Sequence, residues 1–381
     1  MGTTPLTARG RLGWWQGRQR LAMALVNVIA GPFAVMALGL LVAWALRSRV
    51  TAFDFQHAYW QSGHRVLVGA SPYAWSVAQF HLRFVFVYPA LSAVMFAPLS
   101  LLPRSFGVVL FTFVSVALLP AALWVLRVRD WRVYGMATLW EPFFYGWLTA
   151  NQSLYLMFGL ACVWRVRDRP RLAGLLAGAL MSLEPLLWPL GLWLLATRRW
   201  RASLYALASG LVLNLVAWGI VGFGQIGAYL HASATLTGDA WRTGFGIPAL
   251  VGRLGVGWHV GLAALVLVST ALAVALIRSG WRRRSDHHAL VLTVALALVS
   301  SPLLWSHYVM LLLVPLALLR PRLDWPWAVP VVFWASQLPT VPQDWQLVVD
   351  WVGIVVMLVA VARAGRRISS RGLMPAVAAS G

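Results

Sequence analysis

The sequence predicts an all-α integral membrane protein, a polytopic helical bundle of about 10–13 spans. Hydrophobic residues make up 60% of the 381 residues, charged residues make up only 11%, and the mean hydropathy is +0.75. An ordinary soluble domain is about 25% charged, and a soluble chain of this length buries only about 75% of its surface. Most of the apolar surface must therefore face lipid.

The basic charge of the chain fits the same fold class. The net charge is +21, and every basic residue is arginine. The arginines lie in short clusters between apolar runs, as the positive-inside rule predicts, and such clusters suit anionic headgroups. We therefore expect membrane lipids as partners and no nucleic acid. The single cysteine, Cys162, excludes an intrachain disulfide and a multi-cysteine metal site.

The first apolar run, residues 22–46, sets the predicted topology. It is too long for a signal-peptide core of about 7–15 residues, so an uncleaved span is expected. The arginine-rich tail before it favours a cytoplasmic N-terminus. The predicted organisation is a cytoplasmic tail at 1–21, a single transmembrane domain at 22–362 with external loops at 47–84 and 222–257, and a cytoplasmic tail at 363–381.

The later apolar runs each span if they supply about 17–25 residues of helix. Glu184-Pro185 interrupts one of them, which is either one kinked span or two short helices. Two full crossings between residues 84 and 127 would place Arg127 and Arg129 outside, so either one of those runs does not cross or the cluster breaks the rule. The runs lie at 85–102, 105–126, 133–148, 150–164, 172–196, 203–221, 258–277, 288–304, 305–319, 326–341 and 347–362.

The polar stretch after the first span contains the candidate catalytic residue, Asp54. It is one of only ten acidic residues, and it lies where a span should meet water. One interpretation is a helix-end carboxylate that is solvated or paired with Arg47 or Arg49. The other is a general base, whose pKa would rise if Phe53 and Phe55 buried it.

Further polar residues lie at the same predicted external level. An ionisable side chain at a helix centre costs about 2.5–3.5 kcal/mol on insertion scales, so a cluster at one face suggests a site. His307 follows a break at Pro302, and irregular backbone at membrane depth is tolerated where it lines a cavity or is buried in protein. The candidate substrate-binding residues are His57, Arg65, Tyr88, Gln152, Arg242 and His307.

Several short stretches together resemble glycosyltransferase family 87, membrane enzymes of the C-type superfold that use polyprenol-phosphate sugars. No single stretch is specific, but they follow one another in the family's order. They are Phe53-Asp54-Phe55, Gly69-Ala70-Ser71-Pro72-Tyr73, Tyr88-Pro89-Ala90-Leu91 and Ser301-Pro302-Leu303-Leu304-Trp305-Ser306-His307.

Three positions depart from the family's pattern. The family's glycine-glutamine-x-asparagine appears as Asn151-Gln152-Ser153-Leu154, which keeps only the glutamine. Glu184-Pro185 replaces a lysine-proline pair, which reverses a charge. Tyr308 stands where the family has a second histidine after Trp305.

The resemblance implies a C-type glycosyltransferase-like membrane enzyme. It would transfer a sugar, with mannose favoured, from a polyprenyl phosphate to a lipid or glycan hydroxyl on the outer face of the bacterial cytoplasmic membrane. Asp54 would be the general base of an inverting reaction, and His307 would help hold the donor, with no cofactor and no metal. Candidate cations for the donor phosphate are Arg65, Arg83, Arg242, Arg253 and His307.

Other classes of membrane protein remain as alternatives. A transporter or flippase of lipid-linked saccharide tends to have inverted repeats with broken helices in both halves. The sequence has one such break, at Glu184-Pro185, and no matching partner. A polysaccharide polymerase or ligase would share the lipid-linked donor, whereas a non-catalytic assembly factor would not need the gathered Asp and His.

Overall fold

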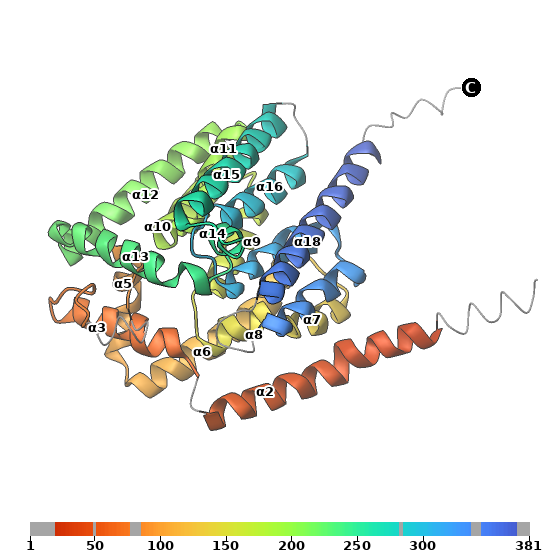
Figure 1. Cartoon of the computed structure of the whole chain (residues 1–381), viewed down its shortest axis with the longest axis horizontal. Coiled ribbons are helices and arrows are strands. Elements are labelled where there is room, and N and C mark those ends of the chain that lie inside the picture. Colours follow the sequence, from red (N-terminus) through yellow and green to blue (C-terminus); the bar gives the residue numbers. More distant parts are fainter. Residues whose placement is uncertain (1–19, 49–50, 77–84, 282–284, 337–343, 372–381) are drawn as a thin grey trace, which may run out of the picture.

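The computed structural model describes residues 20–48, 51–76, 85–281, 285–336 and 344–371. Within these residues the secondary structure consists of helices and turns, with no strand. The predicted all-α membrane fold is therefore confirmed. Most of the helices pack as a bundle, and α2 (Ala34–Ser48) runs along the lower edge of the molecule (Figure 1).

Five described helices are long and apolar enough to cross a membrane. The 22 residues of α12 correspond to about 33 Å at 1.5 Å per residue, slightly more than the roughly 30 Å hydrocarbon core. The first long helix includes a π-helical turn, η1 (Ile29–Phe33), where Pro32 lacks a backbone donor. The five are Arg20–Trp44, α6 (Arg104–Val125), α12 (Trp200–Val221), α15 (Trp258–Trp281) and the Asp344–Ala364 part of α18 (Asp344–Arg371).

Six shorter apolar segments pack among the five long helices, and three of these segments consist of two short helices in series. The predicted 10–13 crossings would require most of these shorter segments to cross the membrane as well. That count stays a prediction. The segments are α5 (Ala90–Phe96) with η3 (Pro98–Leu101), α9 (Ser153–Arg165), α10 (Pro170–Leu183), η4 (Pro185–Leu187) with α11 (Pro189–Ala196), α16 (Asp286–Val299), and η7 (Ser306–Leu312) with α17 (Leu313–Leu319).

The remaining helices connect these segments. The largest fully buried side chains include Trp140, Trp193 and Trp327, so the core is rich in aromatic rings. The connecting helices are η2 (Phe55–Tyr59), α3 (Trp60–Leu67), α7 (Trp131–Thr138), α8 (Glu141–Leu148), η5 (Phe223–Gln225), α13 (Ile226–Ala240), η6 (Trp241–Thr243), α14 (Ile247–Gly252) and η8 (Trp325–Ser336).

Two ambiguities of the sequence are resolved by helix breaks. The run 172–196 is two short helices, because Pro185 forces Glu184 out of the helical region, to φ −140° and ψ 104°. The 12 residues from Ala90 to Leu101 correspond to only about 18 Å, too short to cross alone. Only α6 therefore crosses unaided between residues 84 and 127, so Arg127 can lie on the side of the N-terminal tail.

Contacts around α7 support this placement. The Arg132 guanidinium lies 3.9 Å from the sulfur of Met23, near the start of the first long helix. Asp130 forms a 2.8 Å ion pair with Arg132 and accepts a 2.9 Å hydrogen bond from the Leu323 backbone N–H. Three segments that the positive-inside rule assigns to the cytoplasmic side thus meet one another.

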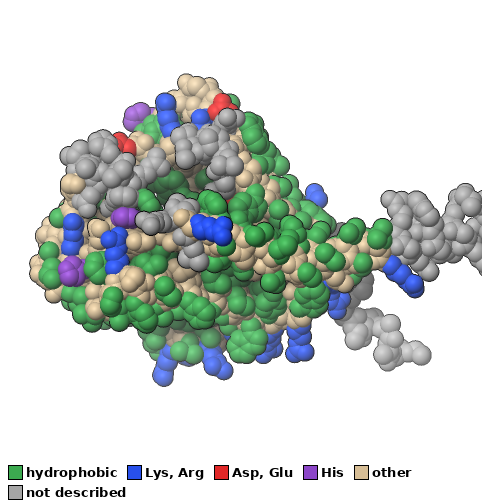
Figure 2. Space-filling view, turned by 90° about the horizontal axis from the view of Figure 1, so that it is seen from below, with side chains coloured by type: hydrophobic (Ala, Val, Ile, Leu, Met, Phe, Trp, Pro, Cys, Tyr) green, Lys and Arg blue, Asp and Glu red, His purple; other side chains and the backbone are tan. Residues whose placement is uncertain are grey.

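The outer surface is apolar, as expected for a chain whose solvent is lipid. On α12 the exposed side chains include Leu204, Leu207 and Leu211, which follow one face of the helix at helical spacing. In Figure 2 hydrophobic side chains cover most of the face shown, and arginines lie in groups, one of them along the lower edge. Arginine groups flanking an apolar surface are the pattern of a polytopic membrane protein.

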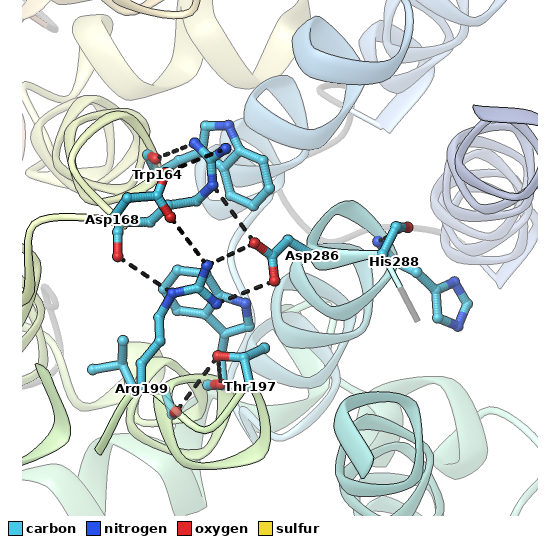
Figure 3. A network of polar contacts seen from close by, with 10 residues as sticks. Trp164, Asp168, Thr197, Arg199, Asp286 and His288 are labelled. Carbon is cyan, nitrogen blue, oxygen red and sulfur yellow. Dashed lines mark hydrogen bonds and ion pairs between the residues drawn. The ribbon is translucent and has the colours of Figure 1, made fainter. Parts of the chain in front are cut away.

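A polar network joins three loops near the start of α12 (Figure 3). The Arg199 guanidinium makes a bidentate contact with Asp286, at 3.1 and 2.6 Å, and lies 3.5 Å from Asp168. Arg167 lies 3.7 Å from both carboxylates. We call Arg167, Asp168, Arg199 and Asp286 the arginine clamp, because they tie the α9–α10 loop to the starts of α12 and α16.

The other end of α12 packs against a different group of loops. The Trp218 ring stacks on Tyr73, at 5.9 Å between centroids, and contacts Tyr229 of α13 at 5.8 Å. Tyr73 and Trp218 share one core cluster with Phe55 and Tyr59. The arginine clamp and the Asp54 region therefore lie at opposite ends of a helix that is as long as a bilayer is thick.

Candidate active site

Asp54 is positioned by the turn that follows α8. The Ala52 N–H donates to the Leu148 carbonyl at 2.6 Å, and the Asp54 N–H donates to the Thr149 carbonyl at 2.8 Å. Ala52 and Ala150 both have left-handed backbone, with φ of 58° and 52°. Such a conformation costs of order 1–3 kcal/mol in a residue other than glycine, and it clusters at functional sites.

The Asp54 carboxylate is held by an amide. Asn151 Nδ2 lies 2.7 Å from Asp54 Oδ2, and Asn151 Oδ1 accepts a 3.0 Å hydrogen bond from the Ser153 backbone N–H, which fixes the amide orientation. Burial raises the pKa of Asp54 to about 6, and the hydrogen bond from Asn151 opposes that rise. Among the described residues no arginine, Arg47 included, forms an ion pair with Asp54; Arg49 lies outside those residues.

Two tyrosines complete the surroundings of this amide. Asn151 Nδ2 also lies 3.1 Å from the Tyr59 hydroxyl and 3.3 Å from the Tyr88 hydroxyl. Tyr59 belongs to the π-helical turn η2 directly after Asp54, and its ring stacks on Phe96 at 4.4 Å. π-Helical turns are frequent at functional sites. The packed aromatic rings hold the two hydroxyls at the Asn151 amide.

A second carboxylate, Glu184, lies in a neighbouring network. Its Oε2 accepts hydrogen bonds from Gln152 Nε2 at 2.9 Å and from the Tyr308 hydroxyl at 2.8 Å. The Tyr88 hydroxyl contacts Asn151, which holds Asp54, and Tyr88 also lines a cleft with Glu184. Tyr88, Glu184 and Tyr308 line one cleft of about 340 Å³, together with Trp188, Tyr229, Ser233 and Trp305.

His307 is buried beside this cleft. Its ring stacks on Tyr145, at 5.9 Å between centroids, and contacts Tyr308 at 4.4 Å. No described residue forms a hydrogen bond with its Nδ1. The preceding Ser306 donates to buried Glu141 at 3.0 Å, which ties η7 to α8.

Two of the predicted residues, His57 and Arg65, line a small hollow beside η2 and α3. Arg104 Nη2 donates to the Gln56 carbonyl at 2.9 Å. Burial and the Arg104 charge lower the pKa of His57, so that this imidazole is neutral at pH 7. The positive charge on this side of Asp54 therefore comes from Arg65 and Arg104.

The predicted loop arginines lie elsewhere. Arg242 is exposed, with its guanidinium 5.0 Å over the Trp241 ring. Arg253 donates to the Arg242 carbonyl at 3.2 Å and forms a 3.2 Å ion pair with Asp344. In the described part of the chain the side chains that contact Asn151 are Asp54, Tyr59 and Tyr88, and Arg83 lies outside the described residues.

The structure thus brings Tyr88, Gln152 and Asp54 into adjoining networks. It adds Tyr59, Asn151, Glu184 and Tyr308, which sequence reasoning did not place in the site. Asn151 could have been found as the neighbour of Gln152. Glu184 and Tyr308 had been noted only as separate departures from the family pattern, yet they form one hydrogen bond.

The arrangement suits proton abstraction from an alcohol. A single carboxylate with a raised pKa is held by a neutral donor, and two hollows lined by residues near it differ in charge. Within the described residues no group of three or more His, Cys, Asp or Glu side chains is placed to hold a metal ion. The Asp54 carboxylate and its uncharged donor can supply acid–base chemistry.

Comparison with known proteins identifies the class as a membrane glycosyltransferase. The model of glycosyltransferase family 87 matches residues 86–306, more than half of the chain, so the chain belongs to this family. The matched range ends just before His307 and begins after Asp54. The family and the glycosyltransferase activity that the resemblance implied are thus confirmed, whereas the role of Asp54 stays a prediction.

Two curated relatives carry the same name, polyprenol-phosphate-mannose-dependent alpha-(1-2)-phosphatidylinositol pentamannoside mannosyltransferase. The Mycolicibacterium smegmatis protein is 29% identical over 304 residues, which are 72% of this chain and 67% of the relative. The Mycobacterium tuberculosis protein is 25% identical over 301 residues, which are 72% of this chain and 64% of the relative. The chain thus covers about two thirds of the length of these relatives. No solved structure matches it.

Proposed function

We propose that this enzyme transfers mannose from a polyprenyl phosphate to a hydroxyl of a lipid or glycan acceptor, with Asp54 as the general base. The observation that carries the proposal is the Asp54 carboxylate, which is partly buried, held by Asn151 and not paired with any described arginine. The two named relatives, which depend on polyprenol-phosphate-mannose, support this donor.

The chemistry is a single displacement. The acceptor oxygen attacks the anomeric carbon while its proton passes to Asp54. The bond from the anomeric carbon to the phosphate oxygen breaks, and the polyprenyl phosphate leaves with the electron pair from the opposite face. One carboxylate suffices for this inversion, because a phosphate leaves without needing an acid.

The cations on the η2 side fit the donor phosphate. Arg65 lines the same hollow as His57, and Arg104 is anchored to the backbone beside them. A charge-assisted contact from a guanidinium stabilises the phosphate as it leaves. His307, with an unpartnered Nδ1, is a further candidate donor of a hydrogen bond.

We also propose that the reaction takes place on the outer face of the cytoplasmic membrane. Asp54 lies at the end of α12 opposite the arginine clamp. The positive-inside rule assigns the clamp arginines to the cytoplasm. A lipid-linked donor keeps its chain in the bilayer and presents its head group at this surface.

The proposal is tested with the purified chain in detergent. Radiolabelled polyprenyl-phosphate mannose is supplied with mannolipid acceptors, and Asp54→Asn is compared with Asp324→Asn, an equivalent change in an Arg320 ion pair. Loss of the general base should lower kcat about 10²–10⁴-fold. Near-normal transfer by Asp54→Asn, with unchanged thermal stability, would overturn the assignment.

The same assay separates the enzyme from a flippase. A flippase of lipid-linked saccharide would move the labelled lipid across vesicles without forming a new glycosidic bond. Transfer of the label to the acceptor, dependent on Asp54, excludes that alternative.

A further inference from the structure

The cleft beside Tyr88 contains a carboxylate and no cation. Its described lining includes Glu184 but no arginine and no histidine. Glu184 is only 8% exposed, and its hydrogen-bond donors, Gln152 and Tyr308, are neutral. An anionic ligand in this cleft would place a second negative charge beside an uncompensated one, which is strongly unfavourable in a poorly hydrated site.

We propose that this cleft is a subsite for a neutral hexose unit of the acceptor, and that Glu184 selects it by accepting hydrogen bonds from the sugar hydroxyls. The inference rests on the proposed function, and it adds the ligand of a cleft that the catalytic proposal leaves unassigned. The carboxylate also excludes acceptors that carry a phosphate on this hexose.

The hydrogen bonds of Glu184 leave room for such a ligand. Gln152 and Tyr308 both donate to Oε2, whereas Oε1 has only a 3.5 Å contact with the Leu186 backbone N–H. The lone pairs of one oxygen thus remain available at the wall of the cleft. A carboxylate acceptor with fixed orientation rejects ligands that lack a matching donor.

The other lining residues suit a sugar ring. Trp188, Tyr229 and Trp305 supply apolar ring faces, and Ser233 and Ser301 supply hydroxyls. The Trp188 indole is itself fixed, because its Nε1 donates to Ser300 at 3.0 Å. Aromatic walls with a few oriented polar groups are typical of small-molecule sites. The volume of about 340 Å³ lies at the small end of such sites.

The charge of the residues that line the two hollows distinguishes acceptor from donor. His57 and Arg65 line the cationic region, Arg104 lies near His57, and the charge of these guanidinium groups attracts the lipid phosphate of the donor. The Glu184 cleft is the anionic side, and Tyr88 connects it to the base. A neutral hexose in this cleft is held by residues other than those that line the cationic hollow.

The test compares Glu184→Gln and Tyr308→Phe with the wild-type chain. With polyprenyl-phosphate mannose and a short oligomannoside, both variants should raise the KM for the acceptor about tenfold and leave the KM for the donor within about twofold. An effect on the donor KM alone, or no effect on either, would overturn the inference. Thermal stability of both variants shows that the fold is retained.

A binding measurement keeps this inference separate from the proposed function. In the Asp54→Asn background, methyl α-mannoside should bind, and mannose 6-phosphate should bind at least about tenfold more weakly. Glu184→Gln should reduce that discrimination to less than about threefold. Equal binding of the two sugars before that change overturns the inference even if transfer succeeds. Selective binding combined with no transfer by the wild-type chain would instead refute the proposed function alone.

Discussion

The carboxylates at the two ends of α12 are held in opposite ways. In the arginine clamp, Asp286 receives two hydrogen bonds from Arg199, and Asp168 lies within 3.7 Å of Arg167 (Figure 3). In the site, Asp54 receives its hydrogen bond from Asn151, an uncharged amide. Both regions gather polar side chains in an apolar chain, but only one neutralises its carboxylates.

This difference distinguishes carboxylates with a structural role from a carboxylate that can act as a base. A carboxylate paired with arginine is stabilised in its charged form and is a poor proton acceptor. Asp130 illustrates this, because the hydrogen bond from Arg132 lowers its pKa to about 2. At Asp54 burial acts in the opposite direction, so the carboxylate stays basic enough to take a proton.

The largest expected effect that tests this comparison comes from removing the amide. Asn151→Leu leaves the partly buried Asp54 without its hydrogen-bond donor, which further raises the pKa of the carboxylate. A hydrogen bond to a charged group contributes about 1.5–3 kcal/mol, so less of the carboxylate is ionised and transfer at pH 7 should fall by up to about 15-fold. Initial rates against pH should also show the acidic limb moved to higher pH.

A purely structural role of Asn151 would lower the rate at every pH without moving that limb. Asn151→Gln, which keeps an amide, serves as the matched control and should recover part of the rate at pH 7. A limb that stays at the same pH in Asn151→Leu contradicts the positioning of Asp54 by this residue.

The pH dependence of the wild-type enzyme gives the next largest effect. Asp54 must be ionised to accept a proton, and its pKa is about 6. As the pH falls through 6 the base becomes protonated, so kcat should fall, to about one tenth of its plateau at pH 5. The residual activity of Asp54→Asn should lack this limb. A wild-type rate that is flat between pH 5 and 7 would contradict Asp54 as the base.

The sequence predicted the fold and the catalytic candidate for the same reason. In a chain with 11% charged residues, an acidic residue at a span end is energetically costly, so a functional role is expected for it. Asp54 is selected on this ground without any knowledge of its neighbours. The break at Glu184-Pro185 was likewise local, because proline restricts the residue before it.

The hydrogen-bond partners of these residues could not be predicted from the neighbouring sequence. Asn151 lies 97 positions from Asp54, and Tyr308 lies 124 positions from Glu184. Gln152 was selected, but its contact with Glu184 depends on how α9 packs beside α10. The loop arginines show the converse limit. Arg242 shares a predicted face with Asp54, yet it lies exposed over Trp241.

In the arginine clamp a substitution should affect stability and spare the chemistry. Asp286→Asn keeps the shape of the side chain and removes the charge that Arg199 contacts. We expect a loss of about 1–3 kcal/mol, seen as a lower Tm in detergent, with an unchanged pH profile of transfer. Asp324→Asn, which breaks the more local pair with Arg320, is the control and should cost less than about 1 kcal/mol. If Asp286→Asn moved the acidic limb of the pH–rate profile, the claim that the arginine clamp acts only on stability would be contradicted.

The smallest expected effect is a change in stability when glycine replaces a residue with left-handed backbone, tested once in each region. Arg198, next to the clamp, has φ 59° and an exposed side chain, whereas Ala150 in the site is fully buried. Relief of left-handed strain gains about 1–2 kcal/mol, and glycine loses about 0.5–1 kcal/mol through chain entropy. Arg198→Gly should therefore stabilise the protein by about 0.5–1 kcal/mol. In Ala150→Gly the lost burial of a methyl group, about 0.8 kcal/mol, offsets that gain, so its Tm should stay near that of the wild type. If Ala150→Gly stabilised the protein as much as Arg198→Gly, the backbone strain in the turn beside Asp54 would be larger than the stabilisation that the buried methyl group provides.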